Sequence, residues 1–565
     1  MHTSTRRRAK EPRFIFVVGG VMSGVGKGIA SSAIAMLLKA RGLNVTALKI
    51  DPYINVDAGT MNPTEHGEVF VMQDGLETDQ DMGNYERFLN QDLPSINYMT
   101  TGSVYQAVIE RERNLGYKGK NVQVVPDIPK EVIRRIERAA AEADADVTIT
   151  EIGGTVGEYE NILFLEAVRM MKSEMPDRVA TVLVSYLPVP GSIGEMKTKP
   201  TQHASRVLNS AGVFADIILA RAPVAIDKKR KEKIATFCNV SPEHVISAPD
   251  VASIYDVPVN FEKEGMSKKL CALLSLDRVC KDTVDLADWK KFVVRSKNGA
   301  KEVKIAVIGK YFSSGDFVLS DVYISVLEAI KYSAYALGAK PVIEYVSSVE
   351  FEQGRKLDTL KQFDGILIPG GFGATGIDGK LKVIEYARTH KIPYFGICYG
   401  MQLAVIEYAR NVAGLTDAHT TEIDPKAPHR VIDVMPDQLT KLKDKQYGGT
   451  MRLGEYPAEI AKGTIAHAAY AKHMRHQKRA TKNEQLISER HRHRYEVNPE
   501  YVERLKEAGL IFSGTSPDGT LMEIAELPRN EHPFFVGVQF HPEFHARPLS
   551  PHPLFTEFVR VSCNT

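Results

Sequence analysis

The chain has 565 residues, of which 43% are apolar and 25% charged, the composition of an ordinary globular protein too long for a single core. A net charge of +2 argues against a nucleic-acid binder driven by bulk electrostatics. No apolar run reaches the length needed to span a bilayer and no signal-peptide pattern opens the chain, so we expect no membrane partner.

The cysteines carry information about the compartment. They are few, odd in number and widely spaced: Cys238, Cys271, Cys280, Cys398 and Cys563. This spacing predicts neither a disulfide framework nor a CxxC metal site. A reducing, cytoplasmic location is therefore expected. Cys238 and Cys271 are expected to be packed rather than reactive.

The chain begins with a polar, basic tail, residues 1–12, which we expect to be disordered. Its three-arginine run could be a localisation or polyanion patch, but a solvated tail is the preferred interpretation. Continuous apolar strands and amphipathic helices then alternate, which predicts a parallel sheet covered on both faces. The strands are expected at Phe14–Val18, Asn44–Ile50, Asp146–Ile152, Val179–Leu187 and Asp216–Arg221.

A glycine-rich turn, Gly19–Gly28, follows the first strand and opens a helix. Glycines let backbone N–H groups surround phosphate oxygens, the helix N-terminus favours anions, and Lys27 adds a positive charge. The spacing is one residue longer than in the common Walker A loop. Gly28 also replaces the Ser or Thr that would bind Mg²⁺. The turn predicts a nucleotide-binding loop of P-loop-like type.

If magnesium is needed, its carboxylate ligands must come from elsewhere. The candidates are the acidic segment 77–81 and Glu151, which ends a predicted strand where ligands gather in doubly wound sheets. An isolated acid usually lies in a solvated loop. A set of acids beside a phosphate loop favours a metal site.

The alternating pattern lapses in a charged stretch that contains Trp289, the only tryptophan. We interpret residues 281–302 as a linker between domains 13–280 and 303–565, because strands and helices resume after it. The second series predicts strands at 303–309, Val342–Val346, Gly365–Ile368 and Pro393–Ile397 and a helix near Val322–Leu337. Lys462–Gln485 has no clear apolar stripe and is interpreted as a surface insertion.

Cys398 lies between glycines where an apolar strand, Ile392–Ile397, meets a helical run, Met401–Val412. Such an elbow exposes a nucleophile over a helix N-terminus and favours the thiolate form. His541 and Glu543, in Gln-Phe-His-Pro-Glu, could supply the base and the group that orients it. A buried structural cysteine is the alternative, but the flanking glycines and the second motif favour catalysis.

Several further segments resemble motifs of CTP synthases. They are Asp51–Asp57, His66–Val71, Glu151–Gly157, Lys197–His203, Gly448–Gly454 and Glu489–Asn498. The resemblance runs from about Phe14 to about Phe555, and although some motifs occur in other amidotransferases, their combination and order are specific. It implies an α/β protein of two doubly wound domains. The first is a P-loop-like amidoligase with a mainly parallel sheet, and the second is a class I glutamine amidotransferase.

CTP synthases convert UTP, ATP and glutamine to CTP, ADP, phosphate and glutamate. The resemblance implies that ATP phosphorylates the uracil 4-oxygen and that ammonia then displaces this phosphate at C4. It also implies Mg²⁺, GTP as an allosteric activator, feedback inhibition by CTP, and homotetramers that can extend to filaments. Phosphoryl transfer depends mostly on positioning and charge neutralisation, which lysines and a metal supply.

The resemblance also implies the nucleotide-binding residues of the first domain. Lys27 would contact the transferred phosphoryl group, Lys49 would add positive charge, and Asp81 and Glu151 would hold Mg²⁺. ATP and UTP would bind at Ser23, Gly24, Val25, Gly26, Lys27, Gly28, Ile29, Lys49, Asp81, Lys197, Thr198, Lys199, Pro200, Thr201, Gln202, Lys233, Pro249, Asp250 and Val251, the last three forming an adenine-contacting loop. CTP would compete at Ser23, Glu158, Tyr159, Glu160, Lys197, Gln202 and Lys233.

For the second domain the resemblance implies that Cys398 attacks the glutamine amide, that His541 acts as base and then acid, and that Glu543 orients it. Backbone N–H groups near Gly371 and Tyr399 would form an oxyanion hole. Glutamine would be held by Gly371, Tyr399, Gly400, Met401, Gln402, Glu422 and Arg494, whose planar fork suits a carboxylate. His66 and Val69 resemble residues lining an ammonia passage. Thr450 and Arg452 lie in a lid-like loop associated with GTP activation.

Three positions depart from the CTP synthase pattern. Tyr399 stands where leucine is usual, but only its backbone is required, so activity should survive. Thr375 replaces an expected arginine, which bears on the GTP response. Gln80 stands where an apolar residue is common, while Asp79 and Asp81 remain.

Two other functions are compatible with parts of the sequence. Amidoligases that amidate corrinoid carboxylates would share the phosphate loop and Cys398, but they give no reason for Lys197–Gln202 or Asp51–Asp57. A non-catalytic assembly protein would not need Lys27 and Cys398 intact. The alternating His and Arg residues of Arg490–Arg494 could form a metal or RNA patch, but a ligand-facing or interdomain segment is the better interpretation.

Overall fold

The computed structural model describes residues 11–191, 194–309, 313–314, 317–318, 320–435, 438, 449–477 and 485–564. The chain divides into two compact units. Unit 1 comprises residues 1–57 and 81–290, and unit 2 comprises residues 58–80 and 291–565. Segment 58–80, which the sequence places within the first domain, thus belongs to unit 2. Most of the basic tail lies outside the described residues.

Unit 1 is built on a seven-stranded sheet of order β5-β2-β6-β1-β7-β8-β9. Every neighbouring pair is parallel, which confirms the predicted parallel sheet. The strands are β1 Arg13–Gly19, β2 Val45–Asp51, β5 Tyr98–Thr100, β6 Val147–Ile152, β7 Val179–Tyr186, β8 Ile217–Ala222 and β9 Val245–Pro249. The five predicted strands correspond to β1, β2, β6, β7 and β8, whereas β5 and β9 were not predicted.

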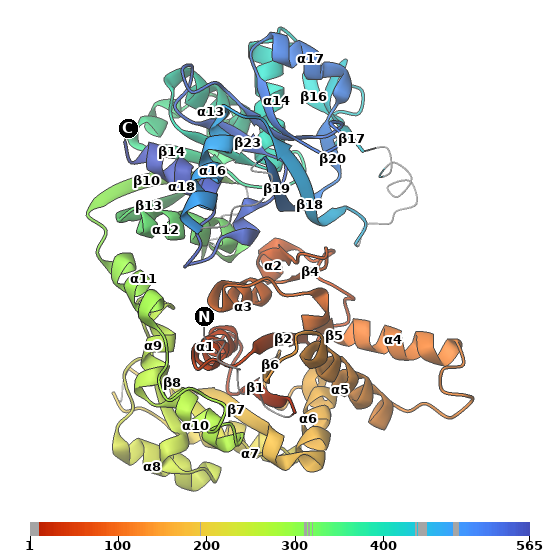
Figure 1. The fold of residues 1–565 in the computed structure, drawn as a ribbon, viewed down its shortest axis with the longest axis vertical. Helices are drawn as coiled ribbons and strands as arrows, with labels where there is room; N and C mark the ends of the chain where they lie inside the picture. Colours follow the sequence, from red (N-terminus) through yellow and green to blue (C-terminus); the bar gives the residue numbers. More distant parts are fainter. Residues whose placement is uncertain are drawn as a thin grey trace, which may run out of the picture. The chain divides into compact units, whose positions relative to one another are not determined.

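Helices alternate with these strands along the chain (Figure 1). They are α1 Lys27–Ala40, α3 Asp81–Leu89, α4 Thr101–Arg113, α5 Val124–Glu142, α6 Ile162–Glu174, α7 Lys199–Ser210, α8 Lys228–Cys238, α9 Asp256–Lys263 and α10 Met266–Leu273. Since ligands of doubly wound sheets bind beyond the carboxyl ends of the strands, the loops after β1, β2 and β6 define the candidate site.

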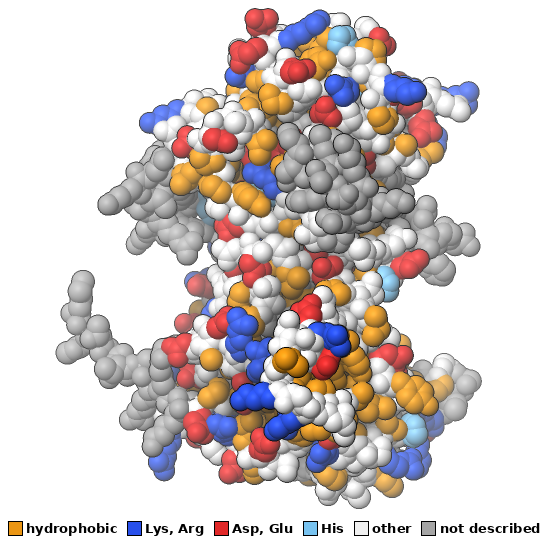
Figure 2. Space-filling view, turned by 90° about the vertical axis from the view of Figure 1, so that its right-hand side faces the viewer, with side chains coloured by type: hydrophobic (Ala, Val, Ile, Leu, Met, Phe, Trp, Pro, Cys, Tyr) orange, Lys and Arg blue, Asp and Glu red, His pale blue; other side chains and the backbone are white. Residues whose placement is uncertain are grey.

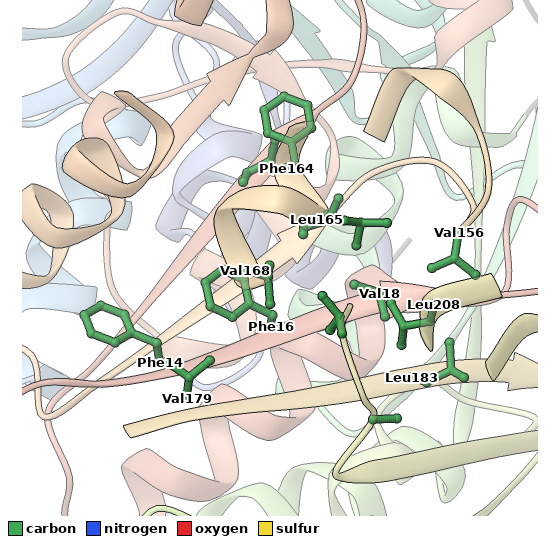
Figure 3. Packing of buried hydrophobic residues seen from close by; sticks show 14 of the residues in the cluster. Phe14, Phe16, Val18, Val156, Phe164, Leu165, Val168, Val179, Leu183 and Leu208 are labelled. Atoms are coloured by element: carbon green, nitrogen blue, oxygen red, sulfur yellow. The ribbon is translucent and has the colours of Figure 1, made fainter. Parts of the chain in front are cut away.

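The core of unit 1 follows from the alternation of side chains along β1. Phe14, Phe16 and Val18 point to one face of the sheet, where they pack with residues of α6 such as Phe164 and Val168 (Figure 3). Ile15 and Val17 are also fully buried. A strand covered on both faces reads as a continuous apolar run, so the sequence pattern of β1 has a direct structural cause.

Unit 2 contains a nine-stranded sheet of order β13-β10-β14-β15-β23-β22-β21-β18-β19. Its first five strands are parallel neighbours and the remaining pairs are antiparallel. The strands are β10 Lys301–Gly309, β13 Ala339–Ser347, β14 Gly365–Ile368, β15 Tyr394–Ile397, β18 Arg452–Ile460, β19 Leu486–His493, β21 Ile511–Thr515, β22 Met522–Glu526 and β23 Phe535–Val538. The parallel half confirms the predicted doubly wound fold, and the antiparallel half was not anticipated.

The other elements of unit 2 surround this sheet or extend from it. The helices are α2 Pro63–His66, α12 Ile324–Ala336, α13 Ile377–His390, α14 Tyr399–Asn411, α16 Ile465–Gln477, α17 Pro499–Glu507 and α18 Pro553–Ser562. A small sheet joins β16 Ala418–Thr420, β17 His429–Val434 and β20 Tyr495–Val497, while β11 Ser313–Ser314 pairs with β12 Phe317–Val318. Segment 58–80 contributes a hairpin of β3 Val69–Val71 and β4 Glu77–Asp79.

The stretch interpreted as a linker contains helix α11, Ala287–Lys297. Its Trp289 is buried against Phe88 and Tyr255 and donates a hydrogen bond to the Tyr255 carbonyl oxygen at 2.9 Å. The charged residues of this helix obscure its apolar pattern, so the sequence did not predict the buried Trp289. The domain limits 13–280, 281–302 and 303–565 remain a prediction, and the compact units differ from them chiefly at segment 58–80.

The structure contradicts two interpretations of the sequence. Lys462–Gln485 is not a simple surface insertion, because α16 buries Ile465, Ala469 and Tyr470, and small alanines make an inconspicuous apolar face. Residues 478–484 lie outside the described part. The expectation that the cysteines form no disulfide is also wrong, because Cys271 and Cys280 are bonded. The chain turns after α10, where the Cys280 N–H donates a hydrogen bond to the Leu276 carbonyl oxygen. This turn brings Cys280 back to Cys271 on α10.

None of the helices in the described ranges is both long enough and apolar enough to cross a membrane.

Candidate functional site

The phosphate loop connects β1 to α1, which begins at Lys27. Gly24 and Gly26 have φ values of 70° and 90°, a left-handed conformation that glycine adopts without a steric penalty. Lys27 Nζ donates a hydrogen bond to the Gly154 carbonyl oxygen at 2.8 Å. Burial lowers the pKa of Lys27, opposed by Glu151 and assisted by Lys49. Ser23 and Gly24 are exposed, so this part of the loop is accessible to a ligand, while Lys27 points to Gly154, just after the end of β6.

Gly28 has a packing reason to lack a side chain. A Cβ at this position would overlap the Asp81 carboxylate. Asp81 begins α3 and thereby takes the place of a hydroxyl-bearing residue at the start of α1. The departure from the Walker A pattern therefore makes room for a carboxylate from another segment.

Behind the phosphate loop is a buried cluster of charged side chains. The Lys49 ammonium group pairs with Asp81, with Glu151 Oε1 at 3.0 Å and with Asp51 Oδ1 at 3.6 Å. Tyr85 donates a hydrogen bond to Glu151. Lys49 and Glu151 are register partners on β2 and β6, so the parallel pairing itself brings these two groups together.

The electrostatics of this cluster follow from burial and pairing. Burial alone would lower the pKa of Lys49, but Asp81, Glu151 and Asp51 hold it well above its usual value. Burial would raise the pKa of Asp81, but Lys49 lowers it. Burial raises the pKa of Glu151, with Lys49 opposing. The cluster thus holds a permanent cation between carboxylates.

Asp81 and Glu151 fit a magnesium ion in ligand chemistry. Mg²⁺ is commonly bound through one or two carboxylates plus phosphate oxygens and waters, and these two oxygen donors converge on a single ammonium group. No group of three or more His, Cys, Asp and Glu side chains in the described part of the chain is arranged to hold a metal by itself. A cation at this site would therefore depend on a phosphate ligand.

An apolar cavity of about 280 Å³ adjoins the phosphate loop. It is lined by Gly26, Ile29, Ala30, Val184, Leu219, Arg221, Ala248, Pro249, Asp250, Val251, Ile254, Val257, Asn260 and Phe261. Arg221 pairs with Asp250 at 2.5 Å and donates to the Val25 carbonyl oxygen at 3.0 Å. The structure thus brings the predicted adenine loop to the predicted phosphate loop. Arg221 was missed, because an arginine at the end of a strand carries no motif.

A second cavity, of about 550 Å³, is also lined by a residue of the loop, Val21. Its lining is Val21, Thr155, Val156, Gly157, Glu158, Pro200, His203, Ala204 and Val207. Glu158 and Pro200 are predicted nucleotide residues. Glu158 accepts a hydrogen bond from the Thr155 N–H at 2.7 Å. The cavity therefore joins the segments predicted to bind UTP and CTP.

The remaining predicted nucleotide-binding residues of unit 1 are outside the linings of these two cavities. Thr201 and Gln202 are buried in α7, where Gln202 donates to Thr198 at 3.1 Å. Lys197 pairs with Glu195 at 2.6 Å. The rest, Lys199, Lys233, Tyr159 and Glu160, are exposed, Tyr159 by 90%. Within unit 1 these four are not part of either cavity.

In unit 2, Cys398 occupies a sharp elbow between β15 and α14. Its φ of 50° is left-handed, and its N–H bonds the Val538 carbonyl oxygen at 2.6 Å. A Cβ on Gly400 would overlap the Ile368 carbonyl, and one on Gly396 would lie 2.7 Å from the Gly400 carbonyl carbon. The flanking glycines are therefore required by packing, as an elbow with a strained nucleophile demands.

His541 and Glu543 lie beside this elbow. His541 Nδ1 is 2.7 Å from Glu543 Oε1. A Cβ on Gly370 would lie 2.8 Å from His541 Cε1 and 3.7 Å from Cys398 Cβ, so the three segments converge. Burial would lower the pKa of His541, but Glu543 and the Cys398 sulfur raise it to about 10. The buried Nε2 atom has no hydrogen-bond partner within the described residues and can exchange a proton with the thiol or a ligand.

The backbone of strand β19 contacts both Cys398 and His541. The His541 N–H bonds the Arg490 carbonyl oxygen at 2.7 Å, and Cys398 Sγ lies 3.8 Å from the Arg492 carbonyl oxygen. Gln539 Nε2 lies 3.7 Å from the same sulfur. Gln539 was missed, although its place in Gln-Phe-His-Pro-Glu could have indicated it.

The predicted glutamine-binding residues fall into two groups. Glu422 accepts a hydrogen bond from the Gly373 N–H at 2.7 Å, two residues beyond Gly371, and Arg494 donates to Gln438 at 2.8 Å. Met401 and Gln402 are buried in α14. Gln402 donates to the Tyr495 carbonyl oxygen at 3.0 Å, so its observed contacts serve packing.

Other predicted residues of unit 2 lie as follows. His66 ends α2 and is exposed, whereas Val69 is buried in β3. Arg452 is not in a loop but begins β18, buried between Glu496 at 3.1 Å and Glu523 at 2.8 Å. Thr375 is exposed. Gly448, in the same motif as Arg452, lies outside the described residues.

The histidines of Arg490–Arg494 do not form a surface patch. His491 and His493 are buried and share a hydrogen bond of 2.9 Å. Burial, assisted by Arg452, holds the pKa of both well below the usual value. An RNA-binding role for these two side chains is therefore unsupported.

A phosphate-loop sheet with buried carboxylates and a cysteine–histidine–glutamate elbow define the class: a glutamine amidotransferase joined to a nucleotide-dependent ligase domain. Comparisons with known proteins agree. Residues 13–276 match the family model "CTP synthase N-terminus", and residues 318–561 match "Glutamine amidotransferase class-I". CTP synthase of Bacillus licheniformis is 47% identical over 555 residues, covering 98% of this chain and 99% of that protein. CTP synthase of Carboxydothermus hydrogenoformans is 49% identical, with 98% and 99% covered.

Among solved structures, the glutaminase domain of Trypanosoma brucei CTPS with bound acivicin is 36% identical, covers 46% of this chain and 94% of that one, and has a TM-score of 0.41. The full-length identities carry the assignment. The chain belongs to the CTP synthase family, the ligases that convert UTP to CTP with nitrogen from glutamine.

Proposed function

We propose that this chain aminates UTP in three steps: glutamine hydrolysis at Cys398, phosphorylation of the uracil 4-oxygen by ATP, and displacement of that phosphate by ammonia. The observation that carries the proposal is the presence, in one chain, of two complete sets of groups. One is Cys398, His541 and Glu543, and the other is Lys27, Lys49, Asp81 and Glu151.

In the glutaminase step, the Cys398 thiolate bonds to the amide carbon and the carbonyl electrons move to oxygen. Backbone N–H groups of Gly371 and Tyr399 receive this oxyanion. His541 gives its Nε2 proton to the leaving ammonia as the carbon–nitrogen bond breaks. It then takes a proton from the water that cleaves the thioester, which releases glutamate and restores the thiolate.

Glutamine binding uses residues at the edge of this elbow. Glu422 would hold the α-amino group and Arg494 the α-carboxylate, with Gly371, Tyr399, Gly400, Met401 and Gln402 forming the rest of the site. Their roles rest on the resemblance. The hydrogen bond from Gly373 to Glu422 supports it, because it fixes a carboxylate next to the oxyanion segment.

In the ligase step, the loop Ser23–Ile29 surrounds ATP phosphates and Lys27 neutralises the transferred phosphoryl group. Lys49 lowers the pKa of Asp81, opposes the rise in the pKa of Glu151 and pairs with both carboxyl groups. A magnesium ion bound by these carboxylates would supply further charge neutralisation. The cavity with Pro249, Asp250 and Val251 supports adenine binding, and the cavity with Glu158 and Pro200 supports a pyrimidine nucleotide site for UTP or CTP.

We assign UTP and CTP contacts to Lys197–Gln202 and Lys233, with Glu158, Tyr159 and Glu160 serving CTP as a feedback inhibitor. His66 and Val69 would line the ammonia passage. GTP would act as an allosteric activator, and Thr375 bears on the strength of its effect. These roles rest on the family resemblance.

A homotetramer in the cytoplasm, extending to filaments, completes the proposal. Exposed apolar side chains near α4 and α5, among them Ile109, Leu115 and Val124, support self-association through unit 1. Figure 2 shows hydrophobic side chains beside charged ones on the viewed face of this unit. Light scattering with and without UTP and ATP measures the assembly.

One assay tests the central proposal. Purified protein is supplied with UTP, ATP and Mg²⁺ plus either glutamine or ammonium chloride, with and without GTP, and CTP is measured by absorbance. CTP should form from both nitrogen sources, and GTP should stimulate only the glutamine route. Failure to aminate UTP with ammonium salts would overturn the proposed ligase step.

A further inference from the structure

The β3–β4 hairpin comes from segment 58–80 but is built into unit 2. Phe70 and Thr78 face each other in the ladder and both are fully buried. At the hairpin turn, the Gln73 carbonyl oxygen accepts a hydrogen bond from the Glu455 N–H at 2.8 Å. A Cβ on Gly75 would lie 2.9 Å from the Leu453 carbonyl oxygen. The hairpin is therefore packed closely against β18.

Two arginines of β19 clamp the hairpin. Arg490 donates to the Val71 carbonyl oxygen at 3.0 Å and lies 5.4 Å from the centre of the Phe70 ring. Arg492 Nε donates to Glu77 Oε1 at 2.8 Å, and the Glu77 side chain is fully buried. The carbonyl groups of these same two arginines contact His541 and Cys398.

A chain of aromatic rings leads from the hairpin to the base. Phe70 meets Phe544 edge to face, with ring centres 5.0 Å apart. Phe544 stacks on the imidazole of His541 at 5.2 Å with an interplanar angle of 13°. Both phenylalanines are buried. The plane of His541 is thus set by Phe544 on its face and by Glu543 at Nδ1.

We propose that the β3–β4 hairpin is a positioning element of the glutamine-hydrolysing site. Phe70 holds the imidazole plane of His541 through Phe544, and Glu77 holds β19 through Arg492. The inference rests on the proposed role of His541 as the base. A displaced base is costly, because misplacement by 1 Å can lower a rate by about a hundredfold.

The first experiment measures glutamate release by Phe70→Leu, which keeps apolar volume but removes the ring. We expect kcat to fall about tenfold with KM for glutamine within about twofold. Phe544→Leu should fall similarly, and the double variant should be no worse than either alone, because the rings act in series. Phe363→Leu is the matched control, since Phe363 is a buried ring of unit 2 in the core cluster, and it should leave kcat unchanged.

The second experiment uses Glu77→Gln, which keeps the shape of the side chain and removes its charge. Its kcat for hydrolysis should fall about three- to tenfold. The pH dependence of Cys398 alkylation by iodoacetamide should shift in both Phe70→Leu and Glu77→Gln, and not in Phe363→Leu. Ammonia-dependent CTP formation should stay within about twofold of wild type, which confirms a folded protein.

Cys398→Ala, assayed in parallel, separates two failures. If Cys398→Ala still hydrolyses glutamine, the proposed function of Cys398 is wrong. If it is inactive while Phe70→Leu and Glu77→Gln match wild type in kcat and alkylation profile, the hairpin proposal alone falls. Additive losses in the double variant would equally overturn the series of rings.

Discussion

The Asp81 carboxylate lies against the α carbon of Gly28, in the space that any side chain at position 28 would need. Position 28 is the second residue of the helix after the phosphate loop, where nucleotide-binding loops usually carry a hydroxyl. The chain has placed a carboxylate from α3 there instead. This pairing links the phosphate loop to Lys49 and Glu151, since Asp81 also pairs with Lys49.

Gly28→Ser should therefore abolish CTP formation from glutamine and from ammonia, because the new side chain displaces Asp81. Glutamine hydrolysis should persist. Ser31→Ala on the same helix is the control, since the buried Ser31 hydroxyl has no partner among the described residues and its removal should be neutral. A Gly28→Ser protein with normal ammonia-dependent synthesis would refute the role of Asp81.

Lys49→Met should cost both stability and synthesis. It leaves the buried carboxylates of Asp81 and Glu151 without their shared cation, and removing one partner of a buried ion pair typically costs about 3–5 kcal/mol. The fluorescence of Trp289, the sole tryptophan and a buried residue of unit 1, reports this unfolding. Lys27→Ala, which leaves Lys49 paired with these carboxylates, should stop synthesis from both nitrogen sources. It should shift the unfolding midpoint less than Lys49→Met does. Equal unfolding midpoints for Lys49→Met and wild type would contradict the stabilising role of the Lys49 ion pairs.

Cys398→Ala should lose glutamine-dependent CTP formation and keep the ammonia-dependent reaction, because only the nitrogen source is removed. Cys563→Ala, a free thiol outside the elbow, should match wild type in both assays. Glutamine-dependent turnover by Cys398→Ala would remove this residue from the mechanism.

The pH dependence of His541 follows from its pKa of about 10. The ordinary value is about 6.5, so folding favours the protonated imidazole. This stabilisation is fully present below pH 6.5 and is lost as pH rises toward 10. The ring-carbon NMR shift of His541 should titrate near 10 in wild type and at a lower pH in Glu543→Gln. The same titration midpoint in both proteins would show that Glu543 does not raise the pKa of His541.

Tyr399 donates a hydrogen bond from its hydroxyl group to the Gly373 carbonyl oxygen at 3.2 Å. Gly373 in turn bonds Glu422. Tyr399→Phe should raise KM for glutamine about three- to tenfold, the equivalent of about one hydrogen bond, with kcat within about twofold. Tyr408→Phe, whose hydroxyl bonds the distant Ala508 carbonyl oxygen, should leave KM unchanged. A KM unaltered by Tyr399→Phe would mean that the hydroxyl does not support the glutamine site.

Local signals in the sequence determined much of this protein. The apolar runs of β1 and β6 predicted buried parallel strands, and the glycines around Cys398 predicted an elbow, because periodicity and backbone freedom are properties of adjacent residues. The same holds for the phosphate loop at Gly24–Lys27. Ordered motifs then indicated the family.

Tertiary structure decided the rest, because contacts between distant segments leave no trace in local pattern. Arg221 at the cavity beside the phosphate loop and Tyr85 on Glu151 are single residues without a motif. Gln539 stands in a motif, but its contact with the Cys398 sulfur depends on the fold. The disulfide between Cys271 and Cys280 depends on a turn that spacing does not reveal. Segment 58–80 belongs to unit 2 because it is buried against β18 and β19. The free energy of that burial arises only when the distant segments meet in the folded chain.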